Sequence, residues 1–263
     1  MEFKPLGDTA VTLPEIGLGT WAYRGGVEPI RRSVELGGFH IDTAEAYSTE
    51  GAVGEAVKGI RDRVFLATKV SPSHFRHDDL ISAADNSLGR LQTDYIDLYQ
   101  LHWPSASVPI GETMAAMEEL VDAGKVRFIG VSNFSAAQIR EAQAAMSKHR
   151  IVSNQVRYSL VARDIESGLL PYCQENHITV IAYSPLARGV YTLRARDRHG
   201  ALTRVARETG KTDAQVALNW CVSKDSVVAI PKTNSVERVE ENCAASGWRL
   251  SEGQIRLLDE SFS

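Results

Sequence analysis

The chain has 263 residues, of which 43% are hydrophobic and 24% are charged, and its formal net charge is −4 at pH 7. These values are typical of a globular protein with a large core. They exclude the concentrated basic surface of a nucleic-acid-binding protein, and no apolar run approaches the ~20 residues that span a bilayer. The N-terminus lacks the apolar region of a secretory signal. We therefore expect a cytoplasmic protein that binds neither nucleic acid nor membrane.

The N-terminal segment 3–13 is typical of a β-hairpin, with Gly7-Asp8 as its turn. After it, short apolar runs alternate with amphipathic segments along the whole chain. The apolar runs are typical of strands buried on both faces, and they lie at 16–21, 39–42, 64–68, 96–101, 128–131, 152–155, 179–182 and 227–230. The amphipathic segments predict helices at 28–36, 78–91, 114–123, 135–148, 165–176, 212–223, 235–245 and 251–262.

Eight strands that alternate with helices imply parallel pairing through crossover connections. The number of strands, and the absence of a split into two halves, favour a closed (β/α)8 TIM barrel over an open sheet. No linker-like or repetitive tract interrupts the chain, so residues 1–263 are predicted to form a single domain.

The three cysteines, Cys173, Cys221 and Cys243, lie far apart, and each falls in a predicted helix. Their spacing matches no metal site and implies no disulfide framework. We therefore expect buried, reduced thiols and no bound metal.

One short pattern suggests a different fold. Residues 17–22 match the G-x-G-x-x-A fingerprint of dinucleotide-binding folds, and Asp42 follows twenty positions later. In such folds the third small residue opens a helix that holds the pyrophosphate. Here residues 23–26 (YRGG) follow and would break that helix, so we reject this interpretation.

Polar side chains recur at or just after the C-terminal ends of the predicted strands, which meet at one face of a barrel. They are Asp42, Tyr47, Lys69, His102, Ser132, Asn133, Gln155, Tyr183 and Ser184. Taken singly, Asp42 is typical of a helix cap, His102 of a hydrogen-bonded core residue and Lys69 of a surface charge. Their joint placement favours an active site.

Four of these residues suit acid catalysis on a carbonyl. A phenol has a pKa near 10, too high for an efficient acid at neutral pH, and the Lys69 ammonium would lower the pKa of Tyr47. Asp42 would pair with Lys69 and offset the cost of its burial. His102 would orient a carbonyl oxygen, which Tyr47 would protonate while hydride arrives at the carbon.

Four segments, in order, resemble segments of the aldo-keto reductase family. Residues 41–47 (IDTAEAY) resemble its IDTA…Y segment, and residues 95–104 (YIDLYQLHWP) resemble its YIDLYxxHWP segment. Residues 129–134 (IGVSNF) are similar to its IGVSNF segment, and residues 230–242 look like its cofactor-binding end. The chain is similar to compact bacterial members that lack the C-terminal loop over the substrate pocket, so we expect a pocket open on that side.

The resemblance implies a barrel whose bottom is closed by the N-terminal hairpin. It also implies NADPH-dependent reduction of an aldehyde or ketone to an alcohol, with NADH as a weaker cofactor, by a monomer. The implied catalytic residues are Asp42, Tyr47, Lys69 and His102. The implied cofactor-binding residues are Thr20, Ser132, Asn133, Gln155, Tyr183, Ser184, Leu186, Lys232, Thr233, Asn234, Ser235, Arg238, Glu241 and Asn242.

The residues themselves support part of this assignment. Lys232 and Arg238 flank a predicted helix start at Ser235, and a helix N-terminus with two cations attracts phosphate. This arrangement suits the extra phosphate of NADPH, although a solvated basic pair would look the same. Trp21 and Trp103 are predicted to wall the substrate pocket, a wall that suits aldehydes, ketones, α-keto esters and sugar-derived carbonyls alike.

Segment 187–201 is predicted to be a loop over the cofactor, with Arg188-Gly189 at the pyrophosphate and the basic stretch 194–199 in solvent. Two alternative functions have different requirements. An NADPH-binding regulatory barrel without turnover would need a partner surface or extension, and none is evident. A phosphate-binding isomerase would need a glycine-rich site after the last strands, where residues 231–234 read PKTN instead.

Overall fold

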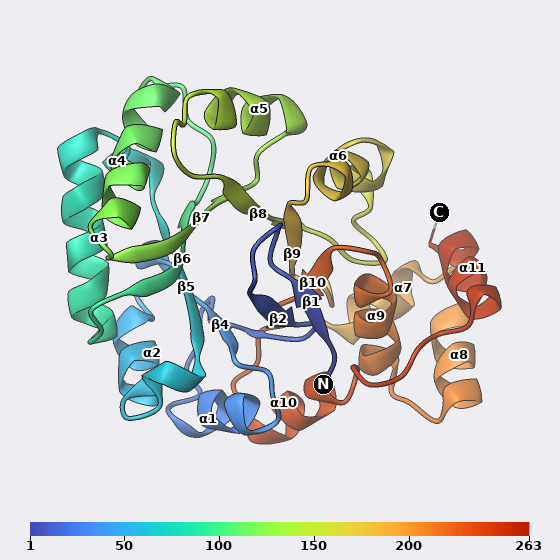
Figure 1. The fold of residues 1–263 in the computed structure, drawn as a ribbon. Coiled ribbons are helices and arrows are strands. Elements are labelled where there is room, and N and C mark those ends of the chain that lie inside the picture. The colour runs from blue at the N-terminus through green and yellow to red at the C-terminus, as the bar shows by residue number, and fades with distance from the viewer. Residues whose placement is uncertain (263) are drawn as a thin grey trace.

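The computed structural model describes residues 1–262, and a curled sheet of eight parallel strands lies at its centre (Figure 1). The strands follow chain order around the sheet: β3 (Leu18–Gly19), β4 (His40–Asp42), β5 (Phe65–Val70), β6 (Ile96–Leu101), β7 (Val126–Ser132), β8 (Ile151–Arg157), β9 (Thr179–Tyr183) and β10 (Val227–Ala229). Its first and last strands meet, because the Gly17 amide donates to the Ala229 carbonyl at 2.8 Å and the Ala229 amide donates to the Glu15 carbonyl at 2.8 Å. The predicted (β/α)8 barrel is confirmed.

Helices surround the barrel and cover its outer face (Figure 1). They are α1 (Glu28–Glu35), α2 (Glu50–Val57), α3 (His77–Leu91), α4 (Ile110–Asp122), α5 (Ala136–Ala144), α6 (Leu169–Glu175), α7 (Val190–Arg196), α8 (Ala201–Thr209), α9 (Asp213–Val222), α10 (Val236–Cys243) and α11 (Glu252–Ser261). Helices from distant parts of the chain lie side by side where the barrel closes, since α1 packs on α10 and Arg32 pairs with Glu240 at 2.8 Å. Among residues 1–262, no helix has both the length and the apolar character of a membrane span.

Local sequence explains where several helices begin. Ser135, Thr212 and Ser251 each form a capping box with a glutamine three residues later, and this box satisfies backbone amides that the helix leaves free. Ser235 caps α10 by accepting from the Arg238 amide at 3.4 Å. The three cysteines are buried, as predicted, and lie in α6, α9 and α10.

Two predicted helices are shorter than the sequence indicates. The segment 135–148 is helical only as far as Ala144, because the amides of residues 147–149 donate to the Glu118 carboxylate instead of continuing the helix. The segment 165–176 is divided at Gly168 into the 3-10 turn η4 (Asp164–Ser167) and α6. A tertiary contact ends the first helix and a glycine divides the second, although the helical pattern of apolar residues continues in both segments.

Three helices were not predicted. The glycines of α2 weaken its helical pattern, but Gly54 is needed because a Cβ there would lie 2.8 Å from the Arg90 carbonyl oxygen. The predicted loop 187–201 is wrong, since α7 occupies its middle and α8 starts at its end. Leu193 of α7 is fully buried, so packing stabilises a helix whose local sequence is uninformative.

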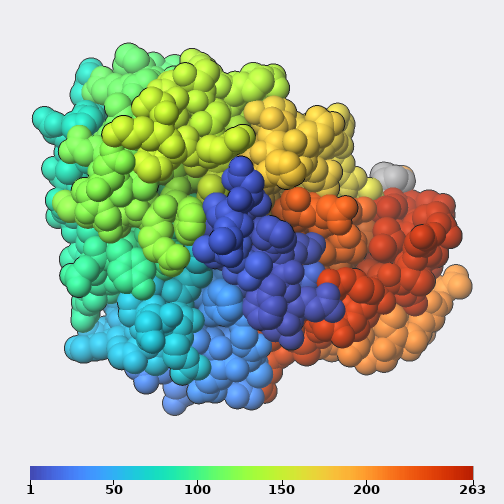
Figure 2. All heavy atoms as spheres, viewed as in Figure 1, coloured from blue at the N-terminus to red at the C-terminus, as the bar shows by residue number. Residues whose placement is uncertain are grey.

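The N-terminal hairpin closes the bottom of the barrel, as predicted. Its strands, β1 (Phe3–Pro5) and β2 (Thr12–Pro14), are antiparallel and lie across the face of the molecule shown in Figure 2. Leu6 and Leu13 are fully buried and pack against apolar side chains of the barrel interior. The hairpin therefore closes one end of the barrel with apolar contacts, and the opposite end, where the strands terminate, stays open to polar groups.

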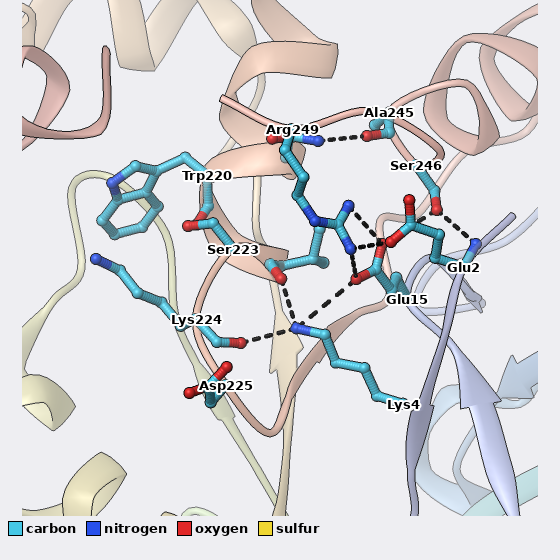
Figure 3. A network of polar contacts seen from close by, with 12 residues as sticks. Glu2, Lys4, Glu15, Trp220, Ser223, Lys224, Asp225, Ala245, Ser246 and Arg249 are labelled. Carbon is cyan, nitrogen blue, oxygen red and sulfur yellow. Dashed lines mark hydrogen bonds and ion pairs between the residues drawn. The ribbon is translucent and has the colours of Figure 1, made fainter. Parts of the chain in front are cut away.

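A buried carboxylate anchors this hairpin to the C-terminal part of the chain (Figure 3). Glu15 is 1% exposed and accepts from Arg249 at 2.6 Å and from the Ser246 hydroxyl at 3.1 Å. Lys4 lies 3.8 Å from Glu15 and donates to the Lys224 carbonyl at 2.7 Å. Burial lowers the pKa of Lys4 to about 8, and the Glu15 charge opposes that lowering.

Replacing Glu15 should destabilise the fold. Glu15→Ala removes the negative charge beside Lys4 and two hydrogen bonds of Arg249. We therefore expect the free energy of unfolding to fall by about 2–3 kcal/mol. Urea denaturation measures this loss. The matched control is Glu2→Ala, which removes an exposed partner of Arg249 and should cost less than about 1 kcal/mol. Equal losses in the two variants would contradict the anchoring role.

Candidate active site

The polar residues singled out in the sequence gather at the end of the barrel opposite the hairpin. Asp42 is the last residue of β4, Lys69 is the penultimate residue of β5, and His102 directly follows β6. Alternation along β5 places Lys69 on the same face as Phe65 and Ala67, which belong to the barrel interior. These strand ends therefore bring residues from distant parts of the chain into one site.

A buried ion pair forms the floor of this site. Lys69 and Asp42 are 0% and 2% exposed, and the Lys69 Nζ lies 2.6 Å from Asp42 Oδ1. The ammonium also donates to the Thr43 carbonyl at 2.8 Å. The second Asp42 oxygen accepts from Gln155 Nε2 at 2.8 Å and from Gln100 Nε2 at 3.3 Å. Because both charges are paired and hydrogen-bonded, the cost of removing them from water is offset.

Gln100 belongs to this candidate site but was not predicted from the sequence. It is fully buried on β6, two positions after the interior residue Leu98, so its side chain points toward the barrel axis. The signal was an amide at an inward position of an otherwise apolar strand. Gln155 was predicted to bind cofactor, and in the structure its amide nitrogen donates to Asp42.

Tyr47 lies above the ion pair on η1 (Glu45–Tyr47), a 3-10 turn that follows β4. Its hydroxyl lies 3.4 Å from His102 Nε2, and the Lys69 Nζ lies 5.0 Å from the centre of its ring. The structure thus brings together the four residues Asp42, Tyr47, Lys69 and His102. Their combination offers a phenolic proton next to a fixed positive charge and an imidazole.

The pKa of Tyr47 shifts in the direction opposite to the one expected from sequence. Burial raises the pKa of the Tyr47 phenol, and the charge of Lys69 opposes this without outweighing it. The expected lowering by Lys69 is therefore present, but it is the smaller effect. The phenol remains protonated at neutral pH and has a proton to give.

His102 is held in its neutral form. Burial, together with the charge of Lys69, lowers the pKa of His102 to about 4. A neutral imidazole carries one N–H donor and one acceptor nitrogen, so it can donate a hydrogen bond without carrying a charge. The carbonyl of His102 accepts from Asn133 Nδ2 at 3.1 Å, which ties this segment to the end of β7.

A second polar group lies on the neighbouring strand ends. Ser132 donates to the Gln155 carbonyl at 2.9 Å, and Asn133 Nδ2 donates to Ser132 Oγ at 3.0 Å. The Tyr183 hydroxyl donates to Asn133 Oδ1 at 3.1 Å, and its ring is half-buried. Asn133 and Ser184 adopt left-handed backbone conformations with φ of 64° and 51°. These turns redirect the chain immediately after each strand, so amides and a flat ring border the site.

The remaining predicted cofactor residues lie around this face. Thr20 directly follows β3 and donates to the Asp42 carbonyl at 2.9 Å. Ser184 and Leu186 follow β9, in the segment that leads to α7. The side-chain oxygen of Asn234, in the loop after β10, accepts from the Arg24 amide at 3.0 Å, and Thr233 Oγ1 accepts from the Ser235 amide at 3.3 Å.

The N-terminus of α10 carries two exposed cations. Lys232 is exposed just before the helix, and the Arg238 side chain is 66% exposed in its first turn. Arg238 pairs with Glu241 in the structure, and Asn242 is buried one position later. A helix N-terminus beside two cations suits an anionic group such as phosphate.

Two tryptophans flank the site. Trp21 follows β3 and is 66% exposed, and Trp103 follows His102 and is 49% exposed. The rings of His102 and Trp103 are stacked with centroids 6.4 Å apart. Exposed aromatic rings at the mouth of a polar site can supply apolar contact to a small molecule.

Comparison with known proteins places this geometry in context. Residues 15–262 match the model of the aldo/keto reductase family. Methylglyoxal reductase YeaE of Escherichia coli is 40% identical over 96% of this chain and 92% of its own length. The structure of the thermostable aldo-keto reductase Tm1743, with the inhibitor epalrestat, has a TM-score of 0.93 at 42% identity and 99% coverage of both chains. An aldo-keto reductase of Klebsiella pneumoniae in complex with NADPH has a TM-score of 0.92 at 38% identity, over 100% of this chain and 96% of its own.

The charge state of His102 can be tested directly. Its folded pKa of about 4 lies below the ordinary value near 6.5, so the native ring takes up a proton only as pH falls through about 4. The unfolded ring does so near 6.5, and native stability should therefore decrease as pH falls from about 6.5 to 4. NMR titration of the ring, assigned with a His102→Gln variant, measures the midpoint. His77, whose pKa is raised by Asp78, is the internal control. A His102 midpoint near 6.5 would refute the burial argument.

Proposed function

The chain belongs to the aldo/keto reductase family, and we propose that it reduces an aldehyde or ketone to the alcohol with Tyr47 as the proton donor. As a member, it is an oxidoreductase that acts on carbonyl groups and uses NADPH. The observation that supports the role of Tyr47 is its hydroxyl, 3.4 Å from His102 Nε2 and above the buried Asp42–Lys69 pair. A proton donor and a hydrogen-bond donor therefore meet where a carbonyl oxygen could lie.

The residues present fit NADPH. The half-buried ring of Tyr183 borders the site beside the amides of Asn133 and Gln155, which suits a flat nicotinamide with its carboxamide. The exposed cations Lys232 and Arg238 at the start of α10 suit the 2′-phosphate. Of the other predicted residues, Thr20, Ser132, Ser184, Leu186, Thr233, Asn234, Ser235, Glu241 and Asn242 would complete the binding surface. When bound, NADPH supplies the hydride that reduces the carbonyl carbon.

The protein's own part in the reaction is to place and move one proton. Neutral His102 would donate a hydrogen bond to the carbonyl oxygen and orient it. As negative charge develops on that oxygen, Tyr47 would transfer its phenolic proton to it. The Lys69 ammonium would stabilise the phenolate that remains, and Asp42 keeps the ammonium in place.

The substrate class proposed is a small carbonyl compound. One relative is named a methylglyoxal reductase, and the rings of Trp21 and Trp103 would provide the apolar walls. A panel of methylglyoxal, other aldehydes, diketones and keto sugars, followed by NADPH oxidation at 340 nm, tests this proposal. Binding of NADPH without turnover of any of these compounds would favour the regulatory alternative. A single domain, a monomeric state and a cytoplasmic location stay predictions.

Tyr47→Phe removes only the phenolic oxygen and its proton. We expect NADPH affinity close to that of the wild type and a loss of turnover of about 100- to 10,000-fold, the usual contribution of a general acid. Steady-state kinetics and NADPH fluorescence titration measure the two quantities. Tyr172→Phe on α6 is the matched control and should leave turnover unchanged. Retained activity in Tyr47→Phe would remove Tyr47 from the mechanism.

Arg238→Ala tests the 2′-phosphate assignment. Loss of one charge-assisted hydrogen bond corresponds to about 10- to 100-fold in affinity, so KM for NADPH should rise by about that factor while KM for NADH changes little. Arg256→Ala is the matched control, because Arg256 is an arginine of similar exposure on α11 that pairs with Glu252. A rise of equal size for both cofactors would show that Arg238 does not contact the phosphate.

A further inference from the structure

We propose that Glu45 is a positioning residue for Tyr47, and this inference rests on the function proposed above. Glu45 opens the 3-10 turn that carries Tyr47, and it was not among the residues predicted from the sequence. Its carboxylate ties that turn to the end of β5, two residues beyond Lys69. The proposed proton donor and its neighbouring cation are thereby fixed relative to each other.

The turn has little local structure of its own. It comprises three residues, and its backbone bonds are those of the Tyr47 amide to the Ala44 carbonyl at 3.0 Å and the Ser48 amide to the Glu45 carbonyl at 3.3 Å. Ser48 then reverses the chain with a left-handed φ of 56°. A single 3-10 turn is weakly stable alone, so the position of Tyr47 depends on contacts with the rest of the barrel.

Contacts with β5 and the loop after it hold the turn at two residues, Thr43 and Glu45. Before the turn, the Lys69 ammonium donates to the Thr43 carbonyl at 2.8 Å. Within the turn, Glu45 Oε1 accepts from the Ser71 amide at 2.5 Å and lies 3.0 Å from His74 Nδ1. Lys69 and Ser71 are only two residues apart, at the end of β5. They hold Thr43 and Glu45, the two neighbours of Ala44, so the turn is attached to the end of β5 on both sides of Ala44.

The Glu45 contact is stronger than an ordinary surface hydrogen bond. The Glu45 side chain is 9% exposed, and a carboxylate that accepts from a backbone amide in such surroundings forms a charge-assisted bond. Ser71 lies at the start of η3 (Pro72–His74), just past the last residue of β5, so its amide belongs to backbone anchored in the barrel. The bond therefore restrains the position of the turn relative to β5.

Loss of this bond should affect Tyr47 before anything else. The Tyr47 hydroxyl lies 3.4 Å from His102 Nε2, and proton transfer needs an approach of about 2.6–3.2 Å to the reacting oxygen. A displacement of about 1 Å in a catalytic group can lower turnover by about 100-fold. Since Glu45 Oε1 is engaged by Ser71 and His74, we assign its effect to the placement of Tyr47, without contact to the substrate.

The test compares three single variants, and one of them is then combined with Tyr47→Phe. Glu45→Ala removes the carboxylate and should lower kcat by about 10- to 100-fold, with KM for NADPH nearly unchanged and a melting temperature that falls by only a few degrees. Glu45→Gln keeps an oxygen that can accept from the Ser71 amide and should retain kcat within about 3-fold. Glu112→Ala is the control, since Glu112 also accepts from a backbone amide, that of His77 at the start of α3 at 3.2 Å, but not near Tyr47. It should leave kcat unchanged.

The Tyr47→Phe background separates positioning from general damage. If Glu45 acts through Tyr47, adding Glu45→Ala to Tyr47→Phe should produce no further loss of turnover, because nothing remains to be positioned. Additive losses, a kcat of Glu45→Ala equal to wild type, or a failure of Glu45→Gln to restore turnover would each overturn the proposal. Wild-type protein without turnover of any carbonyl, or unaffected by Tyr47→Phe, would instead refute the proposed function itself.

Discussion

The buried ion pair between Asp42 and Lys69 is the constraint on which the rest of the site depends. An ammonium that is fully buried is costly unless its partner and its hydrogen bonds are fixed, and here Thr43, Gln100 and Gln155 complete the shell. These groups come from β4, β5, β6 and β8, so these strands, with β7 between them, must end at matching heights. Parallel pairing of neighbouring strands supplies that alignment, so the charge pair depends on the fold.

The two ends of the barrel divide apolar packing from polar chemistry. At the bottom, Leu6 and Leu13 of the hairpin fill the interior, and the Glu15 carboxylate ties that hairpin to Arg249 near the C-terminus. At the top, the interior becomes polar at Lys69, Gln100 and Gln155, two or three residues beyond the last apolar residue of the interior cluster on each strand. The hairpin thus contributes to the site indirectly, by closing the opposite end of the same barrel with apolar side chains.

The same burial gives the two acid–base candidates opposite shifts that suit their proposed roles. Removal from water disfavours the charged form of each group, so the pKa of Tyr47 rises and the pKa of His102 falls to about 4. Both are therefore neutral at physiological pH and both carry a proton. The charge of Lys69 lowers both pKa values. It therefore opposes the rise in the pKa of Tyr47, the proposed proton donor, and adds to the fall in the pKa of His102, the proposed hydrogen-bond donor.

Local features of the sequence determined the sheet, most of the helices and the set of strand-end residues, because apolar periodicity and cap residues act over a few positions. They could not determine that Gln155 reaches Asp42 across 113 positions, or that Gln100 joins them, since an inward amide shows no partner until the barrel closes. Helix α7 and the attachment of Glu45 to Ser71 also depend on distant contacts. The direction of the Tyr47 pKa shift was decided only by tertiary structure, because Lys69 and burial act in opposite directions and the depth of burial is a property of the folded barrel.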